Sequence, residues 1–177
     1  GFSDSFGRET QFFGANPSLS CEIQYLLPKR HTFGKMTMEI QDMNGNKITT
    51  LNPGKSKGIN TVEWNYNMRV PKIAKAKTLS FGGFTSPTVP AGKYKVVIKK
   101  GRDIFEKEIN VSYKNNAGLS EDDRKFQFET VMKLFNMTEE LAYMVYVMDE
   151  VISNESINKK VKAKFEELKK TLVITAF

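Results

Sequence analysis

The stretch VPAGKYKVVIKK, residues 89–100, decides how the first two thirds of this chain fold. It opens with proline and glycine at the places they take in a type I turn, where proline presets φ and glycine ends the turn. A strand follows, because Tyr94, Val96 and Ile98 point to one side while lysines flank them on the other. Val97 is the exception to this alternation. We therefore expect a half-buried strand of an antiparallel sheet.

A second alternating stretch, GINTVEWN at residues 58–65, offers another apolar face. It places Val62 and Trp64 on one side, with Thr61 and Glu63 on the other. Two strands of this kind bury their apolar faces by sharing one core. We therefore expect Trp64, which is in phase with Val62, to pack between two sheets rather than to stack on a sugar.

Further alternating segments extend this pattern to six or seven short strands. The pair Asn44-Gly45 between two of them is a strong hairpin signal. Cys21 takes an inward position of the first strand, so we interpret it as a small buried hydrophobe. Strand number and spacing predict an immunoglobulin-like antiparallel β-sandwich. We assign residues 1–19 to a lead-in segment and residues 20–113 to the sandwich. Strands are expected at 20–28, 35–42, 47–51 and 58–65, from the turn at 89–92 to Lys100, and, after a turn at 101–103, in a last strand lined by Phe105, Ile109 and Val111.

After Tyr113 the spacing between apolar residues changes from two to three and four, which predicts a helical hairpin over residues 119–177. Ser120 precedes three acidic residues, as expected for an N-cap with a capping box that uses Asp123. The first helix, of up to eight turns, should break near Ser153-Asn154, and Lys169 and Lys170 suit the last turn of the second. We interpret the methionines of its stripe as core filling rather than as a partner groove. The stripe consists of Phe128, Val131, Met132, Phe135, Leu141, Ala142, Met144, Val145, Met148 and Ile152.

The net charge of +7 belongs to the β-rich part of the chain. Residues 1–118 carry 18 Lys and Arg against 9 Asp and Glu, whereas residues 119–177 carry 9 against 11. Lysines at alternate strand positions make an exposed face soluble and discourage edge pairing. We therefore expect no nucleic-acid partner, and no segment is apolar enough over about 18 residues to predict a membrane span.

In the segment 67–88, apolar residues follow neither the two-residue spacing of a strand nor the three- and four-residue spacing of a helix. This long irregular segment is the preferred place for a binding function on the sandwich. Aromatic rings and lysines in such a loop could contact a ligand or a partner, although long loops more often tuck their rings into a small cluster of their own. The candidate contacts are Tyr66, Lys72, Lys75, Lys77, Phe81 and Phe84.

No catalytic constellation is visible in the sequence. The only histidine, His31, follows Pro28 in a basic turn without a cysteine or carboxylate at a recognisable spacing, and we interpret it as a surface residue. One His and one Cys do not make a zinc cluster, and no calcium loop or glycine-rich phosphate loop is present. Two carboxylates could still converge in space, as in glycosidases, but the acids here fit solvated strand faces and a helix cap. We predict no catalytic, metal or cofactor-binding residues and no cofactor.

Four stretches in order resemble bacterial immunoglobulin-like modules, such as the flagellar hook-capping domain and the sorting domains of type IX secretion. They are ANPSLSCEIQYLLP at 15–28, MEIQDMNGNKITTL at 38–51, GINTVEWN at 58–65 and VPAGKYKVVIKKG at 89–101. LSFGGFTSPTVPAGKY at 79–94 and LSEDDRKFQFETVMKL at 119–134 resemble the C-terminal region of secreted bacterial proteins that carry sortilin-like BNR propellers and are often labelled glycosyl hydrolases.

This resemblance implies a non-catalytic accessory module of an extracellular or periplasmic protein, and it transfers no active-site residues. Its partner would be the N-terminal domain of the parent chain or another protein. Glycan binding and protein assembly through the helices are the alternatives. No signal peptide is visible, and Gly1 in place of methionine predicts a processed or cloned piece of a longer chain. The helices that follow the sandwich argue against a secretion signal, because sorting domains normally end at the sandwich.

Overall fold

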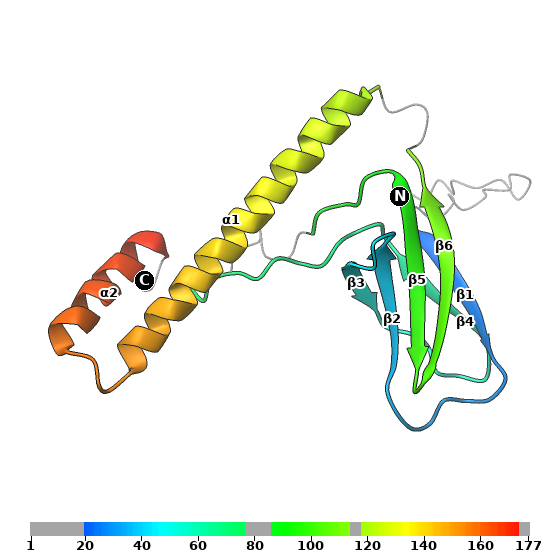
Figure 1. The fold of residues 1–177 in the computed structure, drawn as a ribbon, viewed down its shortest axis with the longest axis horizontal. Helices are drawn as coiled ribbons and strands as arrows, with labels where there is room; N and C mark the ends of the chain where they lie inside the picture. The colour runs from blue at the N-terminus through cyan, green and yellow to red at the C-terminus, as the bar shows by residue number, and fades with distance from the viewer. Residues whose placement is uncertain (1–19, 77–85, 114–117, 174–177) are drawn as a thin grey trace, which may run out of the picture.

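The computed structural model describes residues 20–76, 86–113 and 118–173. Two antiparallel sheets face each other, and a helical hairpin extends from one side of them (Figure 1). This confirms the predicted mainly-β fold with a helical appendage. The elements are β1 (Cys21–Leu27), β2 (Met36–Asp42), β3 (Lys47–Leu51), β4 (Gly58–Trp64), β5 (Gly92–Lys100), β6 (Asp103–Val111), α1 (Glu121–Ser153) and α2 (Lys159–Leu172).

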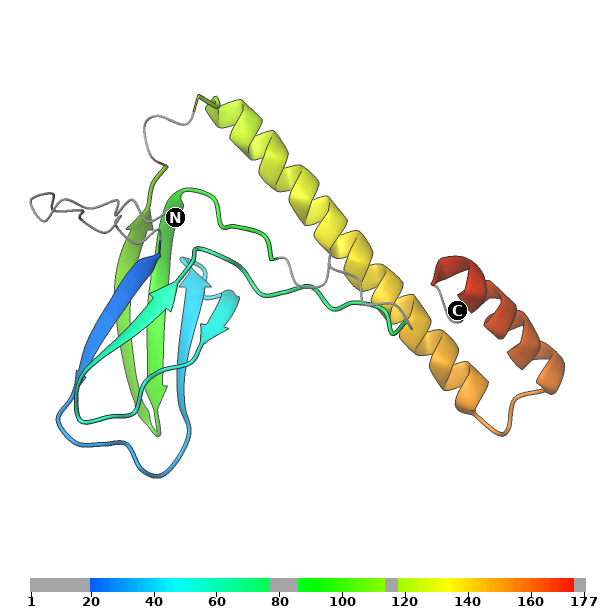
Figure 2. The same ribbon diagram turned by 180° about the vertical axis from the view of Figure 1, so that it is seen from behind.

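The two sheets are unequal. One has four strands in the order β3-β2-β5-β6, and the other pairs β1 with β4 alone among the described residues. Figure 2 shows the two-stranded sheet lying across the larger one. Within the large sheet Tyr94 pairs with Asp42 and Ile109, and within the small sheet Trp64 pairs with Cys21. The apolar faces expected from the sequence pack together in one core between the two sheets.

Trp64 is the centre of the sandwich core, as predicted, with only 1% of its surface exposed. Its ring lies edge-on to Tyr94 at 6.0 Å between centroids, and its Nε1–H donates to the Asn67 carbonyl over 2.9 Å. Cys21 is half-buried at the edge of the same cluster, which agrees with a packing role. The buried members of the core are Met38, Ile40, Trp64, Val89, Tyr94 and Val96.

Val97 lies on the outer face of the large sheet and is nevertheless buried, with 2% of its surface exposed. It is paired between Glu39 of β2 and Glu106 of β6. Lys99 and Glu39 form an ion pair of 3.1 Å on the same face. Long charged side chains cover apolar surface with their methylene groups while their charges stay in water. Val97, the residue that breaks the alternation, is thus a small apolar centre covered by charged side chains.

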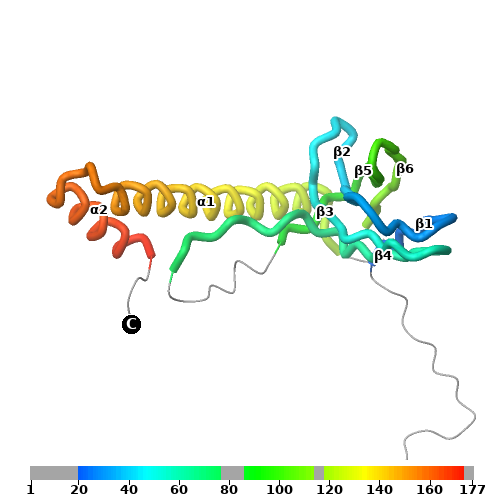
Figure 3. The backbone as a smooth tube through the Cα atoms, turned by 90° about the horizontal axis from the view of Figure 1, so that it is seen from below, coloured from blue at the N-terminus to red at the C-terminus, as the bar shows by residue number. Residues whose placement is uncertain are grey.

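The helices form an antiparallel hairpin, and Figure 3 shows α1 reaching away from the sandwich with the loop after β4 running beside it. Ser120 and Asp123 make the predicted capping box, and α1 continues for 33 residues, about nine turns rather than eight. Of the methionines that we interpret as core filling, Met148 is buried, in agreement with that interpretation. The interpretation is wrong for Met144, which is 49% exposed.

Candidate functional site

Tyr66, a predicted contact residue, belongs to the core rather than to an open binding platform. Its ring lies 5.4 Å from that of Trp64, and its backbone has a left-handed φ of 60°. The Tyr66 carbonyl accepts a hydrogen bond from the Val89 amide over 2.8 Å, and the Met68 amide donates to the Pro87 carbonyl over the same distance. The two ends of the long loop are therefore tied together at the sandwich, and the Tyr66 ring closes the core there.

Of the remaining predicted contacts, the structure describes Lys72 and Lys75. Both are exposed, and the backbone amide of Lys72 donates to the Glu139 carboxylate over 3.0 Å. Lys77, Phe81 and Phe84 lie outside the described residues.

The loop after β4 instead forms a junction with α1, which the sequence patterns do not reveal. Both oxygens of Glu139 accept hydrogen bonds from the Arg69 guanidinium, one of them over 2.7 Å. The same guanidinium lies over the Phe135 ring, with its carbon 4.8 Å from the ring centroid. A bidentate pair combined with a cation–π contact fixes orientation better than either contact alone. Arg69, Lys72, Phe135 and Glu139 thus set the direction in which the hairpin leaves the sandwich.

The Arg69 hydrogen bonds lower the pKa of Glu139 from 4.5 to about 2, and the Lys72 amide contributes to the same effect. Because the folded-state pKa is depressed, the ion pair contributes its full stabilisation above pH 4.5. That stabilisation is lost as the pH falls through about 2, when the carboxylate takes up a proton.

We expect Glu139→Gln to reduce the free energy of unfolding by roughly 1 kcal/mol at neutral pH, since the Arg69 side chain is half exposed and water screens the pair. The difference between wild type and variant should shrink between pH 4.5 and pH 2, as measured by urea unfolding at each pH. Glu140→Gln, one residue along α1 at an exposed position, is the matched control. A Glu139→Gln effect that stays constant over this pH range would contradict the assignment.

A hollow of about 330 Å³ lies at the open side of the sandwich, between β1 and the strands β5 and β6. Cys21 is among the residues that line it. Burial raises the pKa of the Cys21 thiol, which keeps it protonated and is the opposite of what an activated nucleophile needs. The hollow is therefore an apolar gap in the packing with a charged rim, and its lining residues are Cys21, Glu22, Ile23, Gln24, Tyr25, Val96, Ile98, Phe105, Glu106, Lys107 and Ile109.

Several ionisable side chains of the described residues stabilise local structure. Asp42 holds the β2–β3 turn by accepting hydrogen bonds from Asn44 and Asn46, which lowers its pKa. His31 Nε2 lies 3.2 Å from the Gly34 carbonyl in the turn that precedes β2. In the part of the chain that the structure describes, no three His, Cys, Asp or Glu side chains gather as metal ligands do.

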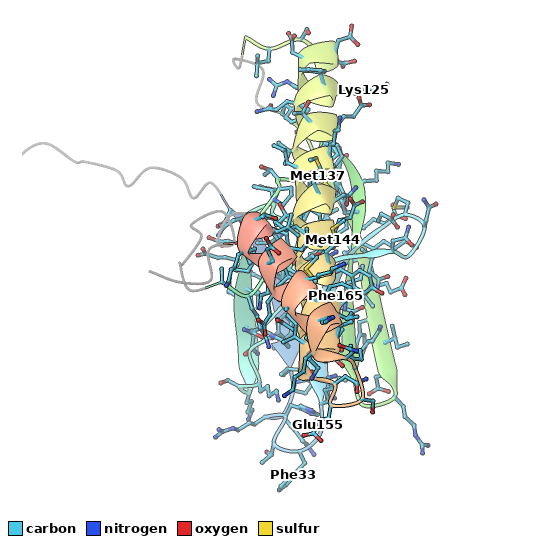
Figure 4. All side chains as sticks on the ribbon, turned by 90° about the vertical axis from the view of Figure 1, so that its left-hand side faces the viewer. Phe33, Lys125, Met137, Met144, Glu155 and Phe165 are labelled. Atoms are coloured by element: carbon cyan, nitrogen blue, oxygen red, sulfur yellow. The ribbon has the colours of Figure 1, made fainter. Side chains whose placement is uncertain are left out.

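Many of the exposed large apolar side chains lie on the helical hairpin. Figure 4 shows Met137 and Met144 along α1, and Phe165 farther down on α2. Helix α2 has 14 residues against the 33 of α1, so it covers only the C-terminal part of its neighbour. The exposed large apolar residues of the two helices are Phe126, Val131, Leu134, Met137, Tyr143, Met144, Tyr146, Val147, Val161, Leu168 and Leu172.

Neither α1 nor α2, the helices of the described residues, is long and apolar enough to cross a membrane. Comparison with known proteins adds no assignment, since no family model, no curated protein and no solved structure matches the chain.

Proposed function

We propose that this chain is a non-catalytic interaction module from the C-terminal part of a larger secreted or periplasmic bacterial protein. In this proposal the sandwich is the rigid base, and the hairpin is the part that binds a protein partner. The resemblance of the sequence to modules that follow BNR propellers supports the proposed origin in a larger secreted protein. The geometry of the hairpin supports its proposed role in binding a protein partner.

The observation that carries the proposal is the exposed apolar face of α1 and α2. Soluble proteins rarely expose contiguous apolar patches of more than a few hundred Å², and larger ones usually mark an interface. On α1 such residues recur over many turns, from Phe126, which is 71% exposed, to Val147. The Arg69–Glu139 junction holds this helix out from the sandwich, where a partner can reach it.

The carboxylates also favour an interaction role over hydrolysis. A general acid at neutral pH needs a raised pKa. Every described carboxyl group with a shifted pKa is shifted downward, each by hydrogen bonds within a turn, a sheet, a cap or the junction. These groups are Glu39, Asp42, Asp123 and Glu139, and each is held as a charged acceptor for its structural partners.

Carbohydrate binding through the loop has no comparable support. Tyr66 packs against Trp64, and Lys72 contacts Glu139 through its backbone. The geometry therefore gives no reason to prefer a glycan over a protein partner. Saturable binding of a polysaccharide that Phe84→Ala abolishes would reverse this preference.

The proposal is tested by placing a photo-crosslinking amino acid at Met144 in the chain expressed as part of its parent protein. We expect crosslinks to protein from Met144 and none from Phe33, which is 88% exposed on the sandwich and serves as the matched control. The isolated chain should show no turnover of a panel of aryl glycosides. Turnover that a single carboxylate substitution abolishes, or equal crosslinking from both positions, would overturn the proposal.

A further inference from the structure

The contact between α1 and α2 is bordered on one flank, the closed flank, by an ion pair and on the other flank by exposed apolar side chains. On the closed flank, Lys169 donates to Asp149 over 2.5 Å, with the Lys169 side chain mostly buried. Val145 and Met148 of α1 are buried in the middle of the contact. On the other flank Met144 is 49% exposed and Leu168 is 47% exposed.

The rotation of the helices places Met144 and Leu168 on the same side of the hairpin. Successive residues of an α-helix are turned by about 100°, so Asp149 and Met144 fall on opposite sides of the buried Val145. By the same rotation, Lys169 and Leu168 fall on opposite sides of the half-buried Phe165 of α2. Since Asp149 and Lys169 meet on one flank, the two apolar residues share the other.

This flank continues along both helices as one surface, which we call the hairpin face. Its members recur at three-, four- and seven-residue spacings, as the anchors of helix-to-helix docking do. All of them are exposed in the described structure. The hairpin face consists of Met137, Met144 and Val147 from α1 and Val161, Leu168 and Leu172 from α2.

The sandwich does not obstruct the hairpin face. The junction contacts α1 through Phe135 and Glu139, which lie two residues on either side of Met137. Two residues correspond to a rotation of about 200° on an α-helix, so both junction residues point away from Met137. A partner on the hairpin face would therefore approach from the side opposite to the sandwich.

The charges of the two helices are complementary, and this identifies the occupant. Helix α1 has eight Asp and Glu against three Lys and Arg, whereas α2 has six Lys against two Glu. Glu150 follows Asp149 near the end of α1, and on the antiparallel α2 Lys164 and Lys160 precede by five and nine residues the Lys169 that pairs with Asp149. In the described structure Glu150, Lys160 and Lys164 are exposed and form no ion pair. A matching surface needs acid opposite α2 and base opposite α1.

We propose that the occupant is a second copy of this chain. Two hairpin faces related by a two-fold axis along the helices bring each α1 against the partner's α2, which buries both apolar faces in a four-helix bundle. The same arrangement sets Glu150 of each copy near the lysines of the other. This inference rests on the proposed function and names the partner that the hairpin binds.

Sedimentation equilibrium of the isolated chain over a range of concentrations tests the dimer. We expect a mass of twice 20.2 kDa, and a dissociation constant raised at least about tenfold by Met144→Glu or Leu168→Glu. Tyr146→Glu is the matched control, because Tyr146 is 57% exposed on α1 but lies on the flank of Asp149. Far-UV circular dichroism checks that each variant stays helical.

Charge reversal tests the pairing of the helices. Glu150→Lys should weaken the dimer, and adding Lys164→Glu to it should restore wild-type association. A monomer at every concentration, or a dimer that Met144→Glu and Leu168→Glu leave intact, would overturn the inference. Crosslinks from Met144 to a different protein alone would also overturn it while the proposed function survives, whereas no specific crosslink would reject both.

Discussion

Replacing Trp64 by alanine is expected to lower the free energy of unfolding of the sandwich by about 3–5 kcal/mol. The side chain is almost fully buried between the sheets, and its ring contacts both Tyr66 and Tyr94. The indole also donates to the Asn67 carbonyl, so its removal leaves that acceptor without its partner. A loss of this size is a large fraction of the total stability of a typical domain. Many molecules would then be unfolded at 37 °C.

Urea unfolding followed by far-UV circular dichroism measures this effect, because the chain has no second tryptophan to report by fluorescence. Phe33→Ala is the matched control: it removes an aromatic ring that is 88% exposed in the turn before β2, and it should change stability by less than about 0.5 kcal/mol. If Trp64→Ala and Phe33→Ala have similar effects, Trp64 does not organise the core.

The strands of the sandwich could be predicted because their signal is local. A period of two, bounded by residues such as Asn44-Gly45, marks each strand without any knowledge of its neighbours. Gly45 does adopt a left-handed φ, of 86°, and Asp42 closes the turn with three hydrogen bonds. Pairing partners follow from the same pattern, since each apolar face has only one core in which to be buried.

The junction between sandwich and hairpin could not be predicted because its parts are far apart in the sequence. Arg69 and Glu139 are separated by 70 residues, and each is an ordinary charged residue in its own segment. The pattern of an apolar stripe likewise says which residues of a helix are hydrophobic and does not say whether another element covers them. Met144 and Met148 belong to one predicted stripe, yet the first is half exposed and the second is buried.

The candidate contacts show the same limit of local signals. Tyr66 is a candidate because it lies beside an irregular loop, but its left-handed backbone conformation accompanies a ring that packs against Trp64. The loop thus helps to position α1, and many of the exposed apolar side chains lie on the two helices. The surface that we propose for a partner therefore depends on contacts between distant segments, which local sequence patterns do not encode.

A second large effect is expected at Gly54, where the backbone passes close to a buried polar side chain. A Cβ atom at this position would lie 2.5 Å from Asn60 Oδ1 and 3.2 Å from its Cγ. Asn60 is only 8% exposed, and its amide group donates to the carbonyls of Ser56 and Gly58. We expect Gly54→Ala to cost about 2–3 kcal/mol, since the methyl group has to displace Asn60 from these hydrogen bonds.

The destabilisation expected for Gly54→Ala is steric and can be separated from backbone strain, because Gly54 does not have a positive φ. Gly45→Ala is the matched control: that position has a φ of 86° and open space around it, so its cost comes from the backbone alone. Urea unfolding of Gly54→Ala, Asn60→Ala and the double variant should give a double-variant cost well below the sum of the two, since the shortened side chain makes room for the methyl group. If the losses in free energy of unfolding are additive, the methyl group clashes with something other than the Asn60 side chain. The Gly54 carbonyl also accepts a hydrogen bond from the Tyr25 hydroxyl over 2.6 Å, so a shift of this segment would loosen β1 as well as β4.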